Sequence, residues 1–161
     1  MNMRVGVLSD THLRGVSKAF GDMCDQFLGD VDVILHAGDF VSAEVVELLC
    51  GRDFHGVHGN MDPIEVKTIL PKKKVVELGP YRIGLIHGWG TSDGLEDRVW
   101  SEFQNTDVIV YGHSHRSANH IKNGVLFFNP GTATGFSYSG IQSVGILDLD
   151  DTVHGEIIPI E

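Results

Sequence analysis

The chain has 161 residues, with 12 Lys and Arg against 22 Asp and Glu, which gives a formal net charge of −10. This acidity argues against a surface that binds nucleic acid non-specifically, so a polyanionic substrate would need a locally positive site. A strand pattern that begins at residue 3 leaves no room for a signal peptide, and no apolar run approaches the ~20 residues that span a bilayer. Length and cysteine content indicate one domain, residues 1–161, in the cytoplasm, with Cys24 and Cys50 expected to be buried free thiols.

Strands and amphipathic helices alternate in the first third of the chain. Short apolar runs predict buried strands, and apolar residues at helical spacing predict helices, the second one capped by Ser42. The predicted order is strand 3–8, helix 17–29, strand 32–35, helix 42–49 and strand 54–57. A β-α-β-α-β order is typical of a parallel sheet.

Hairpins dominate the rest of the chain. Gly79-Pro80, Asn123-Gly124 and Asp150-Asp151 each separate two strand-like runs, and Asn-Gly is a strong hairpin signal. Asp93 is the expected cap of the one further helix. The predicted elements are strands 75–78 and 81–86, helix 94–104, and strands 106–111, 119–122, 125–128, 143–149 and 153–160. A parallel half followed by hairpins predicts an α/β fold of two packed mixed β-sheets flanked by helices, an α/β/β/α sandwich.

Polar side chains with metal-binding atoms follow five of these strands. The carboxyl ends of parallel strands meet at one edge of a sheet, where ligands bind. Burying many unpaired polar groups together is costly unless a ligand compensates them. The set comprises two carboxylates, four imidazoles and one amide: Asp10, His12, Asp39, Asn60, His87, His113 and His115.

The pair His113 and His115 is the most informative part of this set. In an extended chain their side chains share a face, roughly 6.5 Å apart, which suits one metal or two metals ~3.5–4 Å apart. Oxygen and nitrogen donors without thiolate favour manganese, iron, nickel, cobalt or zinc over calcium. Seven donors exceed the needs of one four-coordinate zinc, so we expect two divalent metals; a mononuclear site would leave at least three donors unexplained.

Five short blocks carry a family resemblance. They are Ser-Asp-Thr-His at 9–12, Gly-Asp at 38–39, Gly-Asn-x-Asp at 59–62, His-Gly at 87–88 and Gly-His-Ser-His at 112–115. In these blocks and their order the chain resembles the calcineurin-like metallophosphoesterases over nearly its whole length. Its short length and the run Asn129-Pro130-Gly131-Thr132 resemble the small YfcE-type branch, which also contains the retromer scaffold subunit. The resemblance implies a metallophosphoesterase-like fold and hydrolase activity.

The resemblance also implies a role for each donor. The first metal would be bound by Asp10, His12 and His115, the second by Asn60, His87 and His113, and Asp39 would bridge the two. The implied reaction is hydrolysis of phosphodiesters or activated phosphomonoesters by in-line attack of a metal-bridging hydroxide. The implied catalytic residues are Asp39, Asn60, His87 and His113. We expect two manganese ions, with nickel, iron, cobalt or zinc as alternatives, and a small phosphoester substrate; a homo-oligomer is compatible with the sequence.

One position departs from the family pattern. Met61 stands where the larger enzymes of the superfamily carry a histidine thought to protonate the leaving group, and methionine cannot donate a proton. Asp62, which would pair with that histidine, is explained equally well by capping a turn before Pro63. The rival function is a metal-binding interaction scaffold like the retromer subunit, with little or no turnover. A scaffold has no need of all seven donors, so their presence favours the enzyme.

Other residues near these blocks receive structural interpretations. We expect His36 to be structural, and His58 to be a bystander in preference to a contact of a substrate phosphate. The run Lys72-Lys73-Lys74 is expected to be a solvated strand entrance rather than a binding patch. Trp89, which follows His87-Gly88, would line a substrate pocket or wall the core.

Overall fold

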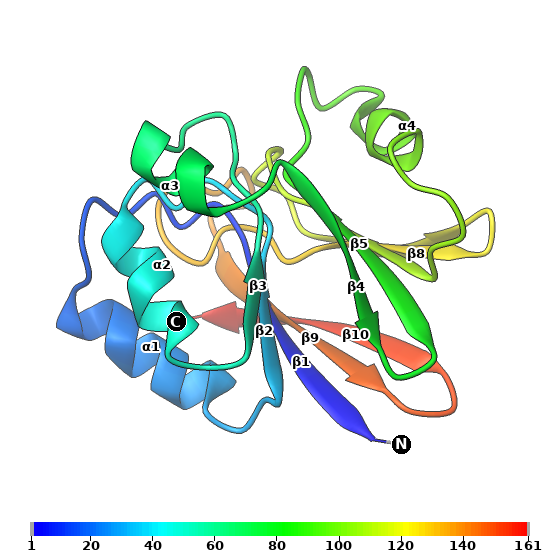
Figure 1. The fold of residues 1–161 in the computed structure, drawn as a ribbon, viewed down its shortest axis with the longest axis horizontal. Helices are drawn as coiled ribbons and strands as arrows, with labels where there is room; N and C mark the ends of the chain where they lie inside the picture. The colour runs from blue at the N-terminus through cyan, green and yellow to red at the C-terminus, as the bar shows by residue number, and fades with distance from the viewer. Residues whose placement is uncertain (1, 161) are drawn as a thin grey trace.

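Two five-stranded sheets form the centre of the computed structural model, which describes residues 2–160 (Figure 1). The first sheet has the order β10-β9-β1-β2-β3, with β1 (Met3–Leu8), β2 (Val33–His36), β3 (Phe54–Gly56), β9 (Gln142–Leu149) and β10 (Val153–Ile160). The second has the order β4-β5-β6-β8-β7, with β4 (Lys73–Leu78), β5 (Tyr81–Ile86), β6 (Val108–Val110), β7 (Ala118–Lys122) and β8 (Val125–Asn129). The helices are α1 (Lys18–Leu28), α2 (Ala43–Cys50), α3 (Ile64–Ile69) and α4 (Leu95–Trp100).

Both sheets are mixed. In the first, β1, β2 and β3 run parallel, and β9 and β10 run antiparallel to their neighbours. In the second, β5, β6 and β8 run parallel, while β4 and β7 form antiparallel edges. The predicted fold class of two packed mixed sheets flanked by helices is therefore confirmed.

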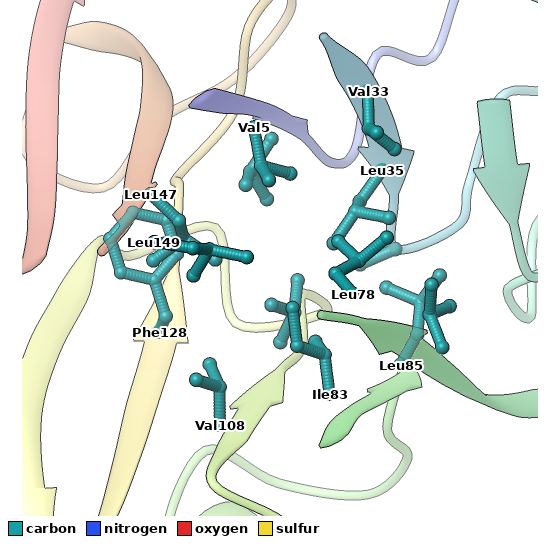
Figure 2. Packing of buried hydrophobic residues seen from close by; sticks show 14 of the residues in the cluster. Val5, Val33, Leu35, Leu78, Ile83, Leu85, Val108, Phe128, Leu147 and Leu149 are labelled. Atoms are coloured by element: carbon teal, nitrogen blue, oxygen red, sulfur yellow. The ribbon is translucent and has the colours of Figure 1, made fainter. Parts of the chain in front are cut away.

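Strand alternation divides the apolar side chains between layers. Val33 and Leu35 of β2 point toward Ile83 and Leu85 of β5, and these side chains belong to the core between the sheets (Figure 2). Ile34, which lies between Val33 and Leu35, instead joins a cluster with residues of α1 and α2 on the outer face of the first sheet. Because successive side chains of an apolar strand point to opposite faces, both faces of each sheet are covered. The result is four layers: helices, sheet, sheet and helices.

The helices lie on the outer faces of the sheets. Ser17 and Ser42 cap α1 and α2 by accepting hydrogen bonds from the backbone N–H groups of Phe20 (3.1 Å) and Glu44 (3.1 Å), as expected for Ser42. The helix α4 packs on the second sheet through an apolar cluster that includes Leu95, Val99, Ile86, Ile109 and Phe127. Within residues 2–160, none of the helices combines the length and hydropathy that a bilayer crossing needs.

Two helical details differ from the sequence-based expectation. The short helix α3 was not expected, because Val66 is its one buried residue and it therefore shows no apolar periodicity. For α4, the predictions that Asp93 caps the helix and that the helix ends at residue 104 are both wrong. Gly94 holds the cap position with a left-handed φ of 74°, which favours glycine, and beyond Trp100 the chain continues in i→i−3 turns.

Both cysteines are free thiols, as expected, but only one is buried. Cys24 lies on the inner face of α1, and burial raises the pKa of its thiol to about 11. Cys50 is exposed at the last position of α2, so its predicted burial is wrong. Its neighbour Leu49 takes the inward position on that helix.

The two-sheet core generates a stability prediction. Leu35 is fully buried between the sheets, so Leu35→Ala should lower the free energy of unfolding by about 2–5 kcal/mol, from lost apolar burial and the resulting cavity. Ile121 lies on edge strand β7 and is 74% exposed, so Ile121→Ala should change the free energy of unfolding by less than about 0.5 kcal/mol. Urea unfolding of both variants measures this; equal effects would contradict the packing of the two sheets.

Candidate metal centre

The loops after β1, β2, β3, β5 and β6 converge where the parallel strands end, in the upper part of the view in Figure 1. Backbone hydrogen bonds tie these loops to one another. The N–H of Asp10 donates to Gly38 O (2.9 Å), that of His12 to Asp39 O (3.0 Å), and that of Gly112 to His87 O (3.1 Å). These main-chain contacts join the loop after β1 to the loop after β2, and the loop after β5 to the loop after β6.

Three donors form a first group around one carboxylate oxygen. Asp10 Oδ1 lies 3.6 Å from His12 Nε2 and 3.4 Å from His115 Nε2. The two imidazole rings lie 5.0 Å apart between centroids. These three residues place their donor atoms within 4.8 Å of one another, which is compatible with a single cation among them.

A second group surrounds His87. Its Nε2 lies 3.1 Å from Asp39 Oδ2 and 3.1 Å from Asn60 Oδ1. The ring of His113 lies 5.2 Å from that of His87 between centroids. The second group therefore brings one carboxylate, one amide and two imidazoles together.

The two groups are continuous through their carboxylates. Asp39 Oδ2 lies 3.6 Å from His12 Nε2 of the first group, and Asp10 Oδ1 lies 3.8 Å from His87 Nε2 of the second. Each carboxylate thus faces imidazoles of both groups. The structure places donor atoms of Asp10, His12, Asp39, His87 and His115 in groups that could hold a metal, Asn60 Oδ1 contacts His87, and the ring of His113 lies beside that of His87.

Backbone carbonyls fix the orientation of three of the imidazoles. A carbonyl oxygen only accepts a hydrogen bond, so the ring nitrogen that contacts it carries the proton. The three pairs are His87 Nδ1 with Ala37 O (2.9 Å), His113 Nε2 with Gly90 O (2.7 Å) and His115 Nδ1 with Phe136 O (2.8 Å). The opposite nitrogen of each ring remains available, which is the usual arrangement of metal-ligating histidines.

The hydrogen-bond balance of the cluster supports a bound cation. When His87 is neutral and carries its proton on Nδ1, its Nε2 presents a lone pair to oxygens of Asp39 and Asn60, so a positive charge, either a proton or a metal ion, is needed between them. Asp10 Oδ1 and His12 Nε2 are buried and have no hydrogen-bond partner within the described residues. Unpaired buried polar groups each cost about 1–3 kcal/mol. A divalent metal that accepts oxygen and nitrogen ligands fits this donor set.

The electrostatics of the cluster stabilise positive charge. Burial opposes ionisation of Asp10, but its contact with His12 and the nearby imidazoles outweigh burial and lower its pKa to about 2. Burial likewise opposes ionisation of Asp39, but the contact with His87 holds its pKa below the ordinary value. The pKa of His12 is raised by its contact with Asp10, and that of His87 is raised because the two carboxylates outweigh its burial.

Backbone strain concentrates at the same residues. Eight non-glycine residues in the described part of the chain have a positive φ, and five of them belong to the donor set. These five are Asp10 (52°), His12 (49°), Asp39 (62°), His113 (72°) and His115 (57°). A left-handed conformation costs about 1–3 kcal/mol for such residues, and this kind of strain clusters at functional sites.

Two glycines allow the close approach of these loops. A Cβ atom at Gly59 would lie 2.1 Å from Asp39 Oδ1, and one at Gly112 would lie 2.0 Å from Ser9 Oγ. Ser9 in turn donates a hydrogen bond of 2.6 Å to Asp10 Oδ2. Any side chain at either glycine would therefore displace groups that hold the two carboxylates in place.

Asp62 has a structural role in this site. Its carboxylate accepts hydrogen bonds from the backbone N–H groups of Asp39 (2.9 Å), Val41 (2.7 Å) and Gly59 (2.8 Å). Both oxygens are therefore occupied by the loops that carry Asp39 and Asn60. Of the two interpretations of Asp62, the turn-capping one agrees with these contacts.

His36 is also structural, as expected. It is fully buried and stacks on Phe40 with ring centroids 3.6 Å apart. The N–H of Gly38 donates to its Nδ1 (3.0 Å), and its Nε2 lies 3.2 Å from Thr11 Oγ1. Burial lowers the pKa of His36 to about 3, so the neutral ring supports the loop before Asp39 without adding charge.

The fold and the donor cluster together define the class of metallophosphoesterases: two mixed sheets flanked by helices, with carboxylate, imidazole and amide donors at the strand ends. Comparison with family models agrees with this class. The model of the calcineurin-like phosphoesterase superfamily domain matches residues 3–152. The chain therefore belongs to the calcineurin-like phosphoesterase superfamily, and it is an enzyme of the phosphoesterase type.

Relatives and solved structures cover nearly the whole chain. A probable metallophosphoesterase of Methanocaldococcus jannaschii is 33% identical over 168 residues, which cover 99% of this chain and 82% of the relative. The structure of an archaeal phosphodiesterase is 26% identical with a TM-score of 0.77, covering 98% of this chain and 100% of that one. Vacuolar protein sorting 29 from Cryptosporidium parvum is 25% identical with a TM-score of 0.75, covering 99% of this chain and 98% of that one.

The role of Asp62 generates a prediction on stability and metal affinity. Asp62→Asn replaces one accepting oxygen by an amide N–H₂, so at least one of the three backbone N–H groups loses its partner. Because hydrogen bonds to charged groups contribute about 1.5–3 kcal/mol, the metal-free variant should be destabilised by about that amount and should bind Mn²⁺ more weakly. Asp151→Asn, in the exposed turn before β10, is the matched control. Urea unfolding and Mn²⁺ titration measure both effects; wild-type stability of Asp62→Asn would contradict this role.

Proposed function

We propose that this protein hydrolyses phosphodiesters or activated phosphomonoesters with the help of two divalent metal ions. The observation that carries the proposal is the continuous donor cluster, in which buried Asp10 Oδ1 and His12 Nε2 have no hydrogen-bond partner among the described residues. Membership of the superfamily and similarity to an archaeal phosphodiesterase support the choice of substrate class.

The two donor groups suggest how the ligands divide. We assign Asp10, His12 and His115 to one metal, and Asn60, His87 and His113 to the other. Asp39 is assigned as the bridge because its Oδ2 lies 3.1 Å from His87 Nε2 and 3.6 Å from His12 Nε2. Manganese is the proposed metal, with nickel, iron, cobalt and zinc as alternatives, since all accept mixed oxygen and nitrogen ligands.

The charge of the site suits an anionic substrate. Two divalent cations against Asp10 and Asp39 would leave a local charge near +2 in a chain whose formal charge is −10. When bound, such cations lower the pKa of a water that they share and neutralise the charge that develops on the phosphoryl oxygens. The side chains His87, His113 and His115 are held by backbone carbonyls, so the protein presents its donors with little reorganisation.

The alternative function is a metal-binding interaction scaffold. The similarity to vacuolar protein sorting 29 supports it, because that protein shares the fold. A scaffold does not require all the donors and their orienting carbonyls, whereas hydrolysis does. Turnover of phosphoesters by the metal-loaded protein therefore separates the two functions.

The dinuclear proposal predicts metal content and the effect of losing the bridge. Protein reconstituted in turn with manganese, nickel, iron, cobalt and zinc should bind close to two metals per chain and hydrolyse bis(p-nitrophenyl) phosphate. Asp39→Ala should lower both metal occupancy and the hydrolysis rate, the latter by at least ~10²-fold, because metal ligands and their partners contribute 10–100-fold or more. The exposed His154→Ala is the matched control. Metal analysis gives the occupancy, initial rates give the activity, and circular dichroism checks the fold. The proposal would be contradicted if the protein bound one metal and Asp39→Ala still bound it.

Met61 predicts how the rate depends on the leaving group. The side chain is 57% exposed and cannot donate a proton, although general acid catalysis typically contributes ~10²–10⁴-fold. Aryl esters, whose leaving groups depart unprotonated, should therefore react far faster than alkyl esters. Met61→His should raise the rate on alkyl more than on aryl esters, even though Asp62 is already occupied by backbone N–H groups. A series of diesters of graded leaving-group pKa measures this; a shallow slope in the wild type would show that another group supplies the proton.

A further inference from the structure

A small pocket opens directly beside the second donor group. It has a volume of about 150 Å³, and its walls include His58, Asn60, Lys67, Lys72, His87 and Trp89. Two of these, Asn60 and His87, belong to the donor cluster, so the pocket is continuous with the candidate metal centre. None of the residues that line it is acidic, although the chain has 22 Asp and Glu against 12 Lys and Arg.

Two lysines, Lys67 and Lys72, line this pocket. Neither Lys67 nor Lys72 forms an ion pair with a carboxylate of residues 2–160. Lys72 Nζ lies 5.3 Å from the centroid of the Trp89 ring. A cation–π contact of this kind holds the ammonium group without neutralising its charge. The side chain therefore brings an available positive charge to the wall of the pocket.

The neighbouring lysines of the run behave differently. Lys73 pairs with Glu102 at 3.7 Å, and Lys74 Nζ lies 2.8 Å from His55 Nδ1. Residues 72–74 are exposed where the chain enters β4, as expected, and Lys72 also lines the pocket. Sequence reasoning missed Lys67 altogether, because it lies on α3, a helix that the apolar pattern does not predict.

We propose that this lysine pocket, formed by His58, Lys67, Lys72 and Trp89, binds a second anionic group of the substrate, either phosphoryl or carboxylate. The inference rests on the proposed function, in which the donor cluster receives the phosphoryl group that is hydrolysed. Lysine ammonium groups are common ligands of phosphate. The pocket is open to solvent, and its volume near 150 Å³ is enough for one compact group. The substrate class is thus a phosphoester that carries one further negative group close to the reacting phosphorus.

Binding of unreactive phosphonates to the manganese-loaded protein tests the pocket. Methylphosphonate carries one anionic group, whereas α,ω-bisphosphonates with linkers of one to four carbons and the matching phosphonocarboxylates carry two. At least one two-headed ligand should bind ~10-fold or more tightly than methylphosphonate, as expected for a charge-assisted hydrogen bond. Comparing bisphosphonates with phosphonocarboxylates shows which of the two anionic groups the pocket prefers. Titration calorimetry gives the affinities.

Tryptophan fluorescence locates the second group. The chain has two tryptophans, so Trp100→Phe leaves Trp89 as the one reporter. Two-headed ligands should change the emission of Trp89 more than methylphosphonate does, because Lys72 contacts its ring. Calorimetry on the unmodified protein provides the same comparison without the Trp100 substitution.

Matched lysine variants decide the outcome. Lys67→Ala and Lys72→Ala should each reduce the preference for two-headed ligands by several-fold or more, Lys72→Arg should restore part of it, and Lys73→Ala should retain it. Equal affinity for one-headed and two-headed ligands, or an equal loss in Lys73→Ala, would overturn the inference. If no phosphoester is hydrolysed with any metal while a Lys72-dependent preference persists, the proposed function is wrong and the anion pocket stands.

Discussion

The contact between two buried carboxylates and the surrounding imidazoles is the constraint on which the rest of this structure depends. Asp10 and Asp39 each face imidazoles of both donor groups at 3.1–3.8 Å. Such a concentration of polar groups is costly to bury, and the left-handed backbone at five of the seven donors adds further strain. A cation in the cluster would offset the cost of burial, which gives a physical reason for a metal centre at this place.

The surrounding protein keeps these groups in position by means that contribute no donor atom. Asp62 accepts three backbone N–H groups, His36 supports the preceding loop as a neutral ring, and Gly59 and Gly112 leave room for the close approach of oxygen atoms. The apolar layer between the sheets fixes the strand ends from which the loops emerge. A rigid framework of this kind makes the site preorganised, as catalysis by electrostatic stabilisation requires.

Charge distribution connects the metal centre with its substrate. The protein as a whole is acidic, so anionic ligands are repelled by most of its surface. Bound metals and the lysine pocket would reverse the sign of the potential locally. The two regions adjoin, because Asn60 and His87 of the donor cluster also line the pocket. Selection for anionic phosphoesters would then arise from a local positive region rather than from net charge.

The sequence by itself determined the features that depend on local pattern. Apolar runs ending in glycine, carboxylate or histidine predicted the strands and the seven donors, because each block combines a strand with the few residues that follow it. Tertiary structure alone decided what depends on long-range packing: the pairing of β9 with β1, the helix α3, the glycine cap of α4 and the exposure of Cys50. It also decided which nitrogen of His87 and of His115 faces the cluster, because the orienting carbonyls of Ala37 and Phe136 lie 50 and 21 residues away along the chain. Lys67 and Lys72 meet Trp89 at the lysine pocket for the same reason, since four separate stretches of the chain, residues 58–60, 67, 72 and 86–89, form its walls.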